Sequence, residues 1–410
     1  MQLPPRIETL VIGGGQAGLA MSEQLSARGM PHLVLERARV AERWRSERWD
    51  GLRSLGPNWG TRIGGFAWTG SEPEGYGSRD EIVAFLDAYA KAIAAPVRCG
   101  VEVRALRATT EGGFRAETSA GAIEADNVVV ATGPFQRPTW PAFAAELGGF
   151  QLHANAYRNA AQLPDGGVLV VGAGTSGVQI ADELLRSGRR VFLSVGRHRR
   201  LPRRYRGHDQ VWWRMEMGLW DAPAQGPGQP GSLTVSGAYG GYTIDFRDFA
   251  ARGMVLLGRA TDAQEGVLRC APDLAQRIAE GDAAFLDFLD TVDRHVAATG
   301  MDAPEDPQAG ALAALPPALL WPPIALDLRA EGVASVVWAT GYALDFSWIG
   351  LPVLRANGQP RHEKGITPVP GLAFLGLSGL SRRNSAFFNG VAADAAHLAD
   401  HLRARGPRPA

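Results

Sequence analysis

Short runs of apolar, β-branched residues alternate with stretches of helical periodicity along both halves of the chain. Residues 7–12 and 32–36 predict buried strands on either side of a helix at 16–28. A second series begins at Val168, with a helix expected at 176–187 and a strand at 190–195. Strands that alternate with helices in this way predict parallel sheets covered by helices.

Between and after these two series the pattern predicts further elements of a mixed α/β fold. A helix is expected at 79–94, because Ser78 is a good N-cap and apolar residues recur on one face. The stretch ERWRSERWDGLRSLGPNWGTRIGGF is too irregular for one element and predicts a loop region that forms a site. The remaining expected segments are a meander at 101–107, 113–118 and 122–124, a buried strand at 127–133, a helical patch at 271–297, a strand at 333–341 and a last helix at 386–404.

The strand-to-helix turn of each series carries the spacing G-x-G-x-x-G, first in LVIGGGQAGLAMSEQL and again in VVGAGTSGVQIADELL. In the first copy Gly13 permits a tight turn, Gly15 lets the backbone approach a pyrophosphate, and Gly18 lets helix and strand pack closely. Glu36 ends the following strand, where a carboxylate accepts hydrogen bonds from ribose hydroxyls. The first copy therefore predicts a dinucleotide site.

The second copy, with Gly172, Gly174 and Gly177, lacks the acid, because Ser194 stands at the end of its next strand. Four basic residues follow instead: Arg197, His198, Arg199 and Arg200. Arginine pairs with a 2′-phosphate that a carboxylate would repel, which favours NADPH over NADH. The competing interpretation is that arginine is simply this chain's usual cation, since Lys91 and Lys364 are its only lysines.

Length and composition narrow the class of protein. A chain of 410 residues exceeds the size of most single cores and predicts two domains. Its 42 basic and 42 acidic residues balance, so nothing favours nucleic acid or an anionic membrane as a partner. Two cysteines without C-x-x-C argue against a redox dithiol. Without a leader or a run of ~18 apolar residues, we expect a cytoplasmic location. His397 and His401 lack a third ligand, so no metal is expected.

A linker between the two series, LGGFQLHANAY, places Gly149, His153 and Tyr157 four residues apart. This resembles the fingerprint of class B flavin-dependent monooxygenases. Leu147 replaces the usual phenylalanine, and Tyr157 followed by Arg158 leans away from Baeyer–Villiger chemistry toward heteroatom or related oxygenation. The resemblance extends over nearly the whole chain: GGGQAG, Glu36, the Trp44 region, Asn58, ATG at 131–133, GAGTSG, ATG at 339–341 with Tyr342, GITPVPGLAFLGL and a C-terminal helix.

The resemblance implies two Rossmann-like dinucleotide-binding domains, the second inserted in the first. An FAD domain is expected at 1–150 and 331–410, and an NADPH domain at 151–330 with substrate or lid insertions at about 205–325. It also implies that FAD, reduced by NADPH, captures O2 as a C4a-(hydro)peroxyflavin and transfers one oxygen atom to a small organic substrate. A homodimer is left open.

The same resemblance and the glycine motifs supply the candidate site residues. Asn58 and His153 are the catalytic candidates, although an Asx turn after Pro57 and a structural histidine are the competing interpretations. The FAD candidates are Gly13, Gly15, Gln16, Ala17, Gly18, Glu36, Arg37, Trp44, Arg45, Ala131, Thr132, Gly133, Asn389 and Gly390. The junction candidates are Gly149, Thr340, Gly341 and Tyr342, and the NADPH candidates are Gly172, Gly174, Thr175, Ser176, Gly177, Ser194, Arg197, His198, Arg199 and Arg200.

Two other functions share both nucleotide motifs. An NADPH-dependent flavoprotein reductase would pass electrons to a quinone or a protein acceptor, and only its disulfide-reducing form is disfavoured by the missing C-x-x-C. A nucleotide-binding redox sensor would gate a partner and oxidise NADPH slowly. The sequence leaves both open.

Overall fold

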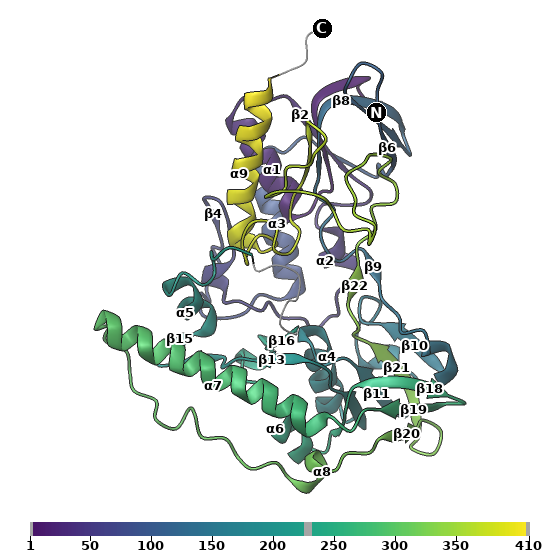
Figure 1. Cartoon of the computed structure of the whole chain (residues 1–410), viewed down its shortest axis with the longest axis vertical. Helices are drawn as coiled ribbons and strands as arrows, with labels where there is room; N and C mark the ends of the chain where they lie inside the picture. Colours follow the sequence, from purple (N-terminus) through teal and green to yellow (C-terminus); the bar gives the residue numbers. More distant parts are fainter. Residues whose placement is uncertain (1–2, 225–231, 407–410) are drawn as a thin grey trace.

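The computed structural model describes residues 3–224 and 232–406. It contains two parallel-stranded sheets, one in each of two parts of the molecule that meet at a narrow junction (Figure 1). Within the described residues no helix combines the length and the apolar character needed to cross a bilayer.

The first sheet has seven strands, and its centre is parallel. The order is β5-β2-β1-β8-β7-β6, with β23 pairing β8, and only β8-β7 and β7-β6 are antiparallel. Its strands are β1 (Arg6–Ile12), β2 (His32–Glu36), β5 (Val97–Cys99), β6 (Val103–Ala108), β7 (Phe114–Thr118), β8 (Gly121–Val130) and β23 (Leu372–Phe374).

The second sheet has five parallel strands in the order β10-β21-β11-β12-β17. These are β10 (Phe150–His153), β11 (Gly167–Val171), β12 (Val191–Ser194), β17 (Val255–Leu257) and β21 (Val333–Trp338). Successive residues of β11 enter different cores: Val168 and Val170 pack with helix α4, whereas Leu169 and Val171 pack with Leu268 on the other face. This alternation is what a strand buried on both sides requires.

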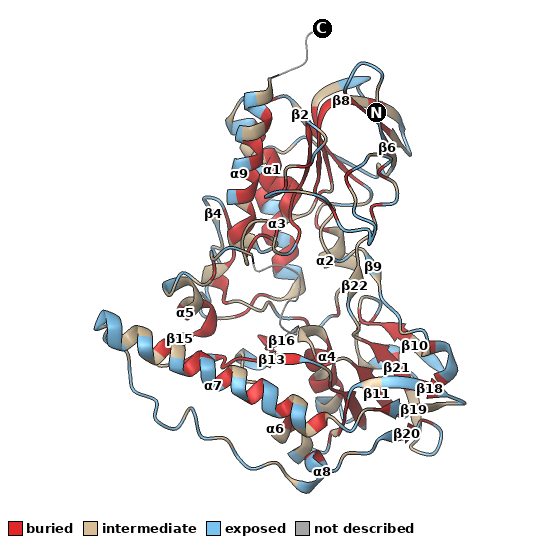
Figure 2. Cartoon of the chain, viewed as in Figure 1, coloured by how far each residue is buried: buried red, intermediate tan, exposed pale blue. Residues whose placement is uncertain are grey.

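Helices cover the sheets in both parts of the molecule. In the first part α1 packs against α9, and Figure 2 shows their facing sides buried and the outer side of α9 exposed. Helix α3 begins with a capping box. The Ser78 hydroxyl accepts from the Glu81 N–H, and the Glu81 carboxylate accepts from the Ser78 N–H. The helices are α1 (Gln16–Ala27), α2 (Glu42–Ser46), α3 (Arg79–Ala92), α4 (Thr175–Arg186), α5 (Gln210–Glu216), α6 (Phe246–Ala251), α7 (Leu274–Thr299), α8 (Pro317–Leu320) and α9 (Phe388–Arg405), with 3-10 turns at Asn58–Gly60, Ala144–Leu147, Ala160–Gln162 and Ala238–Gly240.

Short strands complete the fold where the chain passes between the sheets. β9 and β22 pair at the junction itself, so the outgoing and returning chains lie side by side (Figure 1). The others form small ribbons: β3 (Arg62–Ile63) with β4 (Phe66–Ala67), β9 (Arg137–Pro138) with β22 (Tyr342–Ala343), β13 (His198–Arg200) with β16 (Ser232–Thr234), β14 (Arg204–Tyr205) with β15 (His208–Asp209), and β19 (Val267–Cys270) between β18 (Ala260–Gln264) and β20 (Ala325–Asp327).

The mixed α/β fold with parallel sheets agrees with the prediction, and three details differ. The segments expected at 122–124 and 127–133 form the single strand β8, because its central residues pair with β1 on one side and β7 on the other. Strand 333–338, which we assigned to the FAD domain, pairs instead with β10 and β11 in the second sheet. Helices α5 and α6 were missed, since both are shorter than eight residues and show little periodicity. The insertion of one domain in the other stays a prediction.

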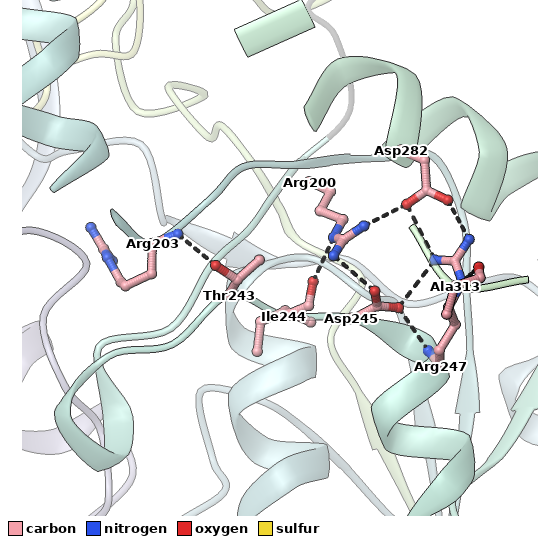
Figure 3. Close-up of polar contacts among 8 residues, drawn as sticks. All are labelled: Arg200, Arg203, Thr243, Ile244, Asp245, Arg247, Asp282 and Ala313. Carbon is pink, nitrogen blue, oxygen red and sulfur yellow. Dashed lines mark hydrogen bonds and ion pairs between the residues drawn. The ribbon is translucent and has the colours of Figure 1, made fainter. Parts of the chain in front are cut away.

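A buried network of charges holds β13 and α6 against α7 (Figure 3). Arg200 lies 2.6 Å from Asp282 and 2.8 Å from Asp245, and Arg247 lies 2.6 Å from Asp282. The four side chains keep between 10% and 16% of their surface exposed. Arg200 Nε also donates to the Ile244 carbonyl at 3.0 Å. Each buried charge therefore has an opposite partner, as burial demands.

We expect Asp282→Ala to reduce the free energy of unfolding by about 3–5 kcal/mol, because it leaves Arg200 and Arg247 with one carboxylate between them. Urea titration followed by circular dichroism measures the loss. Asp290→Ala is the matched control on the same helix: Asp290 and its partner Arg294 keep 67% and 66% of their side-chain surface exposed, so its loss should stay below about 1 kcal/mol. Equal losses in the two variants would contradict a structural role for the network.

Candidate active site

The first glycine motif forms the turn between β1 and α1, and its backbone leaves no room for side chains at two positions. Gly13 has φ +115°, and a Cβ there would lie 2.6 Å from the Ala131 carbonyl oxygen. A Cβ on Gly18 would lie 1.8 Å from the Gly13 carbonyl oxygen. The loop is therefore packed against the ATG turn at 131–133, which brings two candidate segments together.

Gly15 is the opposite case, because a Cβ there would meet nothing within 4 Å. It opens onto a cavity of about 520 Å³ beside the start of α1. Ten of the predicted FAD residues line this cavity: Gly13, Gly15, Gln16, Ala17, Glu36, Arg37, Trp44, Ala131, Thr132 and Gly133. Lining residues that the sequence did not single out include Arg43, Arg48, Val101, Val103, Phe135, Gln136, Arg137, Asp345, Trp348, Gly376 and Ala386.

Glu36 lies at one end of the cavity with both carboxylate oxygens oriented by the backbone. Oε2 accepts from the Gly14 N–H at 2.7 Å, and Oε1 accepts from the Ala38 N–H at 3.0 Å. Each oxygen keeps a lone pair for a second donor. This is the geometry that a ribose hydroxyl needs, and it fits the carboxylate role predicted for the first motif.

Arg48 and its aromatic neighbours form another wall of the cavity. The guanidinium carbon lies 5.6 Å from the Trp44 ring centre and 5.2 Å from that of Phe135. Burial holds the pKa of Arg48 below its usual value, and Tyr342 partly offsets this effect. The Trp- and Arg-rich loop signalled a site, but periodicity does not tell which of its arginines turns inward. Arg45 turns away, donating to the Val40 carbonyl and pairing with Asp87.

The segment before α9 reaches the same cavity through Ala386, whose carbonyl accepts from Gln16 Nε2 at 2.7 Å. The two residues selected there have structural contacts. Asn389 Oδ1 accepts from Trp220 Nε1 at 2.9 Å, and a Cβ on Gly390 would lie 2.2 Å from the Asn384 carbonyl oxygen. Neither Asn389 nor Gly390 lines the cavity, so their predicted place beside the flavin is not supported by the structure.

The second glycine motif repeats the geometry of the first. Gly172 has φ +109°, with a Cβ position 2.5 Å from the Ala339 carbonyl oxygen, and a Cβ on Gly177 would lie 1.8 Å from the Gly172 carbonyl oxygen. The second ATG thus packs on the second loop as the first does on its own. Gly174 is the N-cap of α4, whose first turn holds Thr175 and Ser176. Thr175 Oγ1 donates to the Leu233 carbonyl of β16 at 2.9 Å.

The four basic residues after β12 do not act together. Arg197 is exposed and Arg199 is half-buried, whereas His198 packs edge-on against Phe246 at 4.9 Å and Arg200 belongs to the network with Asp282. The His198 ring contacts α6 and the Arg200 guanidinium contacts α7, so neither side chain is placed to bind a nucleotide. Ser194 is buried too, with its hydroxyl between the Gly258 carbonyl and the Ala260 N–H.

His153 joins two segments of the chain at the junction. Nε2 lies 3.0 Å from the Gly341 carbonyl oxygen and therefore donates to it, while the ring meets Tyr342 edge-on at 5.0 Å. Burial lowers the pKa of His153, so the ring is neutral at pH 7. Thr340 Oγ1 donates to the Thr139 carbonyl across the same junction. Gly149, at φ +67°, directly precedes β10, and a Cβ there would lie 4.0 Å from the Ala334 carbonyl oxygen.

Asn58 is buried away from both His153 and the cavity. Nδ2 donates to the Glu72 carbonyl at 2.9 Å, and Oδ1 has no hydrogen-bond partner within the described residues. The amide therefore braces the loop between Pro57 and Gly77, and its role beside the flavin stays a prediction.

The glycine loops agree with a family comparison. The model of the family described as pyridine nucleotide-disulphide oxidoreductase matches residues 10–212, which include both loops. An uncharacterized CzcO-like oxidoreductase of Geobacillus kaustophilus is 33% identical over 403 residues, covering 97% of this chain and 98% of the relative. The indole-3-pyruvate monooxygenase YUCCA1 of Oryza sativa is 34% identical over 197 residues, covering 45% of this chain and 47% of the relative.

Solved structures share the fold along the whole chain. A flavin-containing monooxygenase from Stenotrophomonas maltophilia aligns with TM-score 0.68 and 19% identity over 99% of both chains. The bacillithiol disulfide reductase of Bacillus cereus aligns with TM-score 0.63 and 18% identity, covering 98% and 99%. OTEMO in complex with FAD and NADP aligns with TM-score 0.56 and 16% identity, covering 98% and 86%. The expected resemblance and the oxidoreductase class are confirmed, and this chain belongs to the family of CzcO-like oxidoreductases, which has the flavin-monooxygenase fold.

Proposed function

We propose that this protein is an FAD-containing monooxygenase that uses NADPH and O2 to oxygenate a small organic substrate. The observation that carries the proposal is the pair of equivalent glycine loops, each packed by its own ATG turn, on either side of one junction. Two loops of this kind suit a resident dinucleotide and a second one that delivers electrons to it.

The first loop fits FAD. Its open face at Gly15, the start of α1 and the oriented carboxylate of Glu36 match the pyrophosphate and the ribose of a dinucleotide. The arginines along the cavity, Arg43 and Arg48 among them, supply positive charge near the diphosphate. The FAD and NADP bound in the OTEMO structure support the same pair of cofactors here.

The second loop fits NADPH better than NADH. Helix α4 offers its N-terminus, and no carboxylate stands at the end of β12 to select an unphosphorylated ribose. Arg197 lies three residues after Ser194, the last residue of β12. Its side chain is exposed and can pair with a 2′-phosphate.

When bound, reduced flavin supplies the two electrons that let one oxygen atom of O2 reach the substrate while the other leaves as water. The residues of this chain position and shield the reactants. We propose that His153, neutral and donating to Gly341, sets the angle between the two parts, and that aromatic side chains such as Trp44 and Phe135 exclude water. A role for Gly149 and Asn58 near the flavin, a cytoplasmic location and a homodimer also stay predictions.

A reductase that passes electrons to a quinone or a protein acceptor is the second candidate, because the bacillithiol disulfide reductase shares the fold. The fold alone does not separate the two. The 34% identity between 45% of this chain and the indole-3-pyruvate monooxygenase YUCCA1 favours oxygenation. A nucleotide-binding sensor has no observation in its favour beyond the loops themselves.

Gly15→Ala should give protein that folds but retains little FAD. Gly15 has φ −88°, which alanine adopts, and its new methyl group would occupy only the open space that the pyrophosphate needs. The ratio of FAD to protein after purification, from absorbance, measures the effect. Gly65→Ala is the control, because Gly65 also has open space around it but lies away from the cavity. A full complement of FAD in Gly15→Ala would remove the first loop from the site.

Arg197→Ala should raise KM for NADPH about tenfold or more and leave KM for NADH within about twofold, since only NADPH carries the 2′-phosphate that a charged hydrogen bond would hold. Steady-state NAD(P)H oxidation measures both constants. Arg294→Ala, an exposed arginine of α7, serves as control. Equal changes for the two coenzymes would assign Arg197 to the surface only.

The proposed reaction itself is tested with 18O2. Holoenzyme with NADPH should consume one O2 per NADPH and place one 18O atom in a product from a panel containing a thioether, an amine, an aldehyde and indole-3-pyruvate, as measured by mass spectrometry with parallel assays of hydrogen peroxide. Reduction of an added quinone together with no 18O in any organic product would favour the reductase instead. The oxygen-transfer route implied by the family resemblance stays a prediction.

A further inference from the structure

Three half-buried arginines come from separate elements of the fold. Arg199 lies in the middle of β13, Arg214 in the last turn of α5, and Arg383 in the segment before α9, and all three are half-buried. Within the described residues none of them has a carboxylate at ion-pair distance. By contrast, Arg200, Arg203 and Arg247 each have a carboxylate within 2.6 Å.

Hydrogen bonds join the segment that follows Arg214 to the segment that contains Arg383. The Trp220 N–H donates to the Arg214 carbonyl at 2.9 Å, and the Trp220 ring lies 4.5 Å under the Arg214 guanidinium. Trp220 Nε1 donates to Asn389, and the Arg383 N–H donates to the Ala222 carbonyl at 3.0 Å. The segment after α5 is therefore fastened to the segment that begins α9.

The three charges act on one another. Burial, with a smaller contribution from the charges of Arg199 and Arg383, lowers the pKa of Arg214 to about 10. Burial and Arg383 also lower the pKa of Arg199, against a smaller opposite effect of Asp287 on α7. Asp287 thus offsets part of one charge and leaves the cluster with an excess of positive charge in a half-buried place. Such an arrangement is stabilised when an anion binds.

Aromatic surface adjoins the cluster on the side of α9. The Trp220 and Phe387 ring centres lie 5.2 Å apart, and Phe387 is 41% exposed. The next residue, Phe388, stacks on Trp44 at 5.8 Å, and Trp44 lines the FAD cavity. A molecule held by the arginines would lie beside apolar ring faces and close to the wall of the proposed flavin site.

We propose that Arg199, Arg214 and Arg383 form an anion-binding site that holds the carboxylate of a small aromatic acid as substrate. This inference rests on the proposed function for its chemistry and names the substrate class. The other source of an anion is the 2′-phosphate of NADPH. Arg199 of β13 pairs with Leu233 of β16, and the Leu233 carbonyl accepts from Thr175 of the second loop. Trp220 and Phe387 favour the aromatic acid, since a ribose phosphate has no use for them.

The test compares two ligands that share a ring system and differ in charge, indole-3-acetate and indole-3-acetamide, by calorimetric titration of oxidised holoenzyme. The acid should bind at least about tenfold more tightly than the amide, and Arg214→Gln or Arg383→Gln should remove that difference. Arg214→Lys should restore part of it. Arg294→Gln is the matched control and should change nothing.

Stability distinguishes a binding role from a structural one. Without ligand, Arg214→Gln and Arg383→Gln should melt at the same temperature as the unchanged protein or higher, because each relieves repulsion. A fall of several degrees in both would show that the arginines hold the fold, and would overturn the proposal.

The remaining outcomes are also decisive. If the variants raise KM for NADPH and not for NADH, and leave indole-3-acetate binding unchanged, the anion is the coenzyme phosphate and the substrate assignment fails. If indole-3-acetate and indole-3-acetamide bind the unchanged protein equally, the three arginines do not bind a carboxylate and the proposal is wrong. Binding does not require turnover, so loss of acid binding in the variants together with no 18O in any product would uphold this site while the monooxygenase proposal falls.

Discussion

The absence of a side chain at Gly18 and Gly177 is the constraint on which the rest of the structure depends. In both loops the third glycine lies so close to the first that a Cβ would sit 1.8 Å from its carbonyl oxygen. This contact lets the helix start directly above the end of its strand, so the N–H groups of its first turn point to one spot. The cavity beside Gly15 exists because the turn around it is that tight.

The junction links the two parts of the molecule that carry the glycine loops. The outgoing strand β9 and the returning strand β22 pair with each other, and His153 joins them through the Gly341 carbonyl. Because Gly341 ends the ATG turn that packs on the second loop, the histidine contacts the same turn that shapes the nucleotide candidate.

Charge is distributed in this molecule by two different rules. Arg200, Arg203 and Arg247 are buried with carboxylates and hold segments of the second part together. Arg48, Arg199 and Arg214 are half-buried and have no carboxylate at ion-pair distance among the described residues, and burial lowers the pKa of each. Keeping a charge away from both water and an opposite charge is costly. That cost marks the places where an anionic ligand would stabilise the protein.

By itself the sequence determined the features that depend on neighbouring residues: both glycine loops, the strands that enter them, the capped helix after Ser78, and Glu36 at its strand end. These are local because a tight turn, a cap and a strand period each involve only a few consecutive positions. The resemblance, and not a local pattern, supplied Trp44 and the ATG turn at 131–133, which line the same cavity as the first glycine loop and Glu36.

Only the tertiary structure decided which member of a run of similar residues faces which partner. Arg199 and Arg200 are adjacent, yet Arg200 is bound by Asp282, 82 positions away, while Arg199 shares its surroundings with Arg214 and Arg383. Strand 333–338 likewise belongs to the second sheet, because it pairs with β10 on one side and β11 on the other. Such outcomes depend on contacts between segments distant along the chain, and the local pattern of residues carries no signal of them.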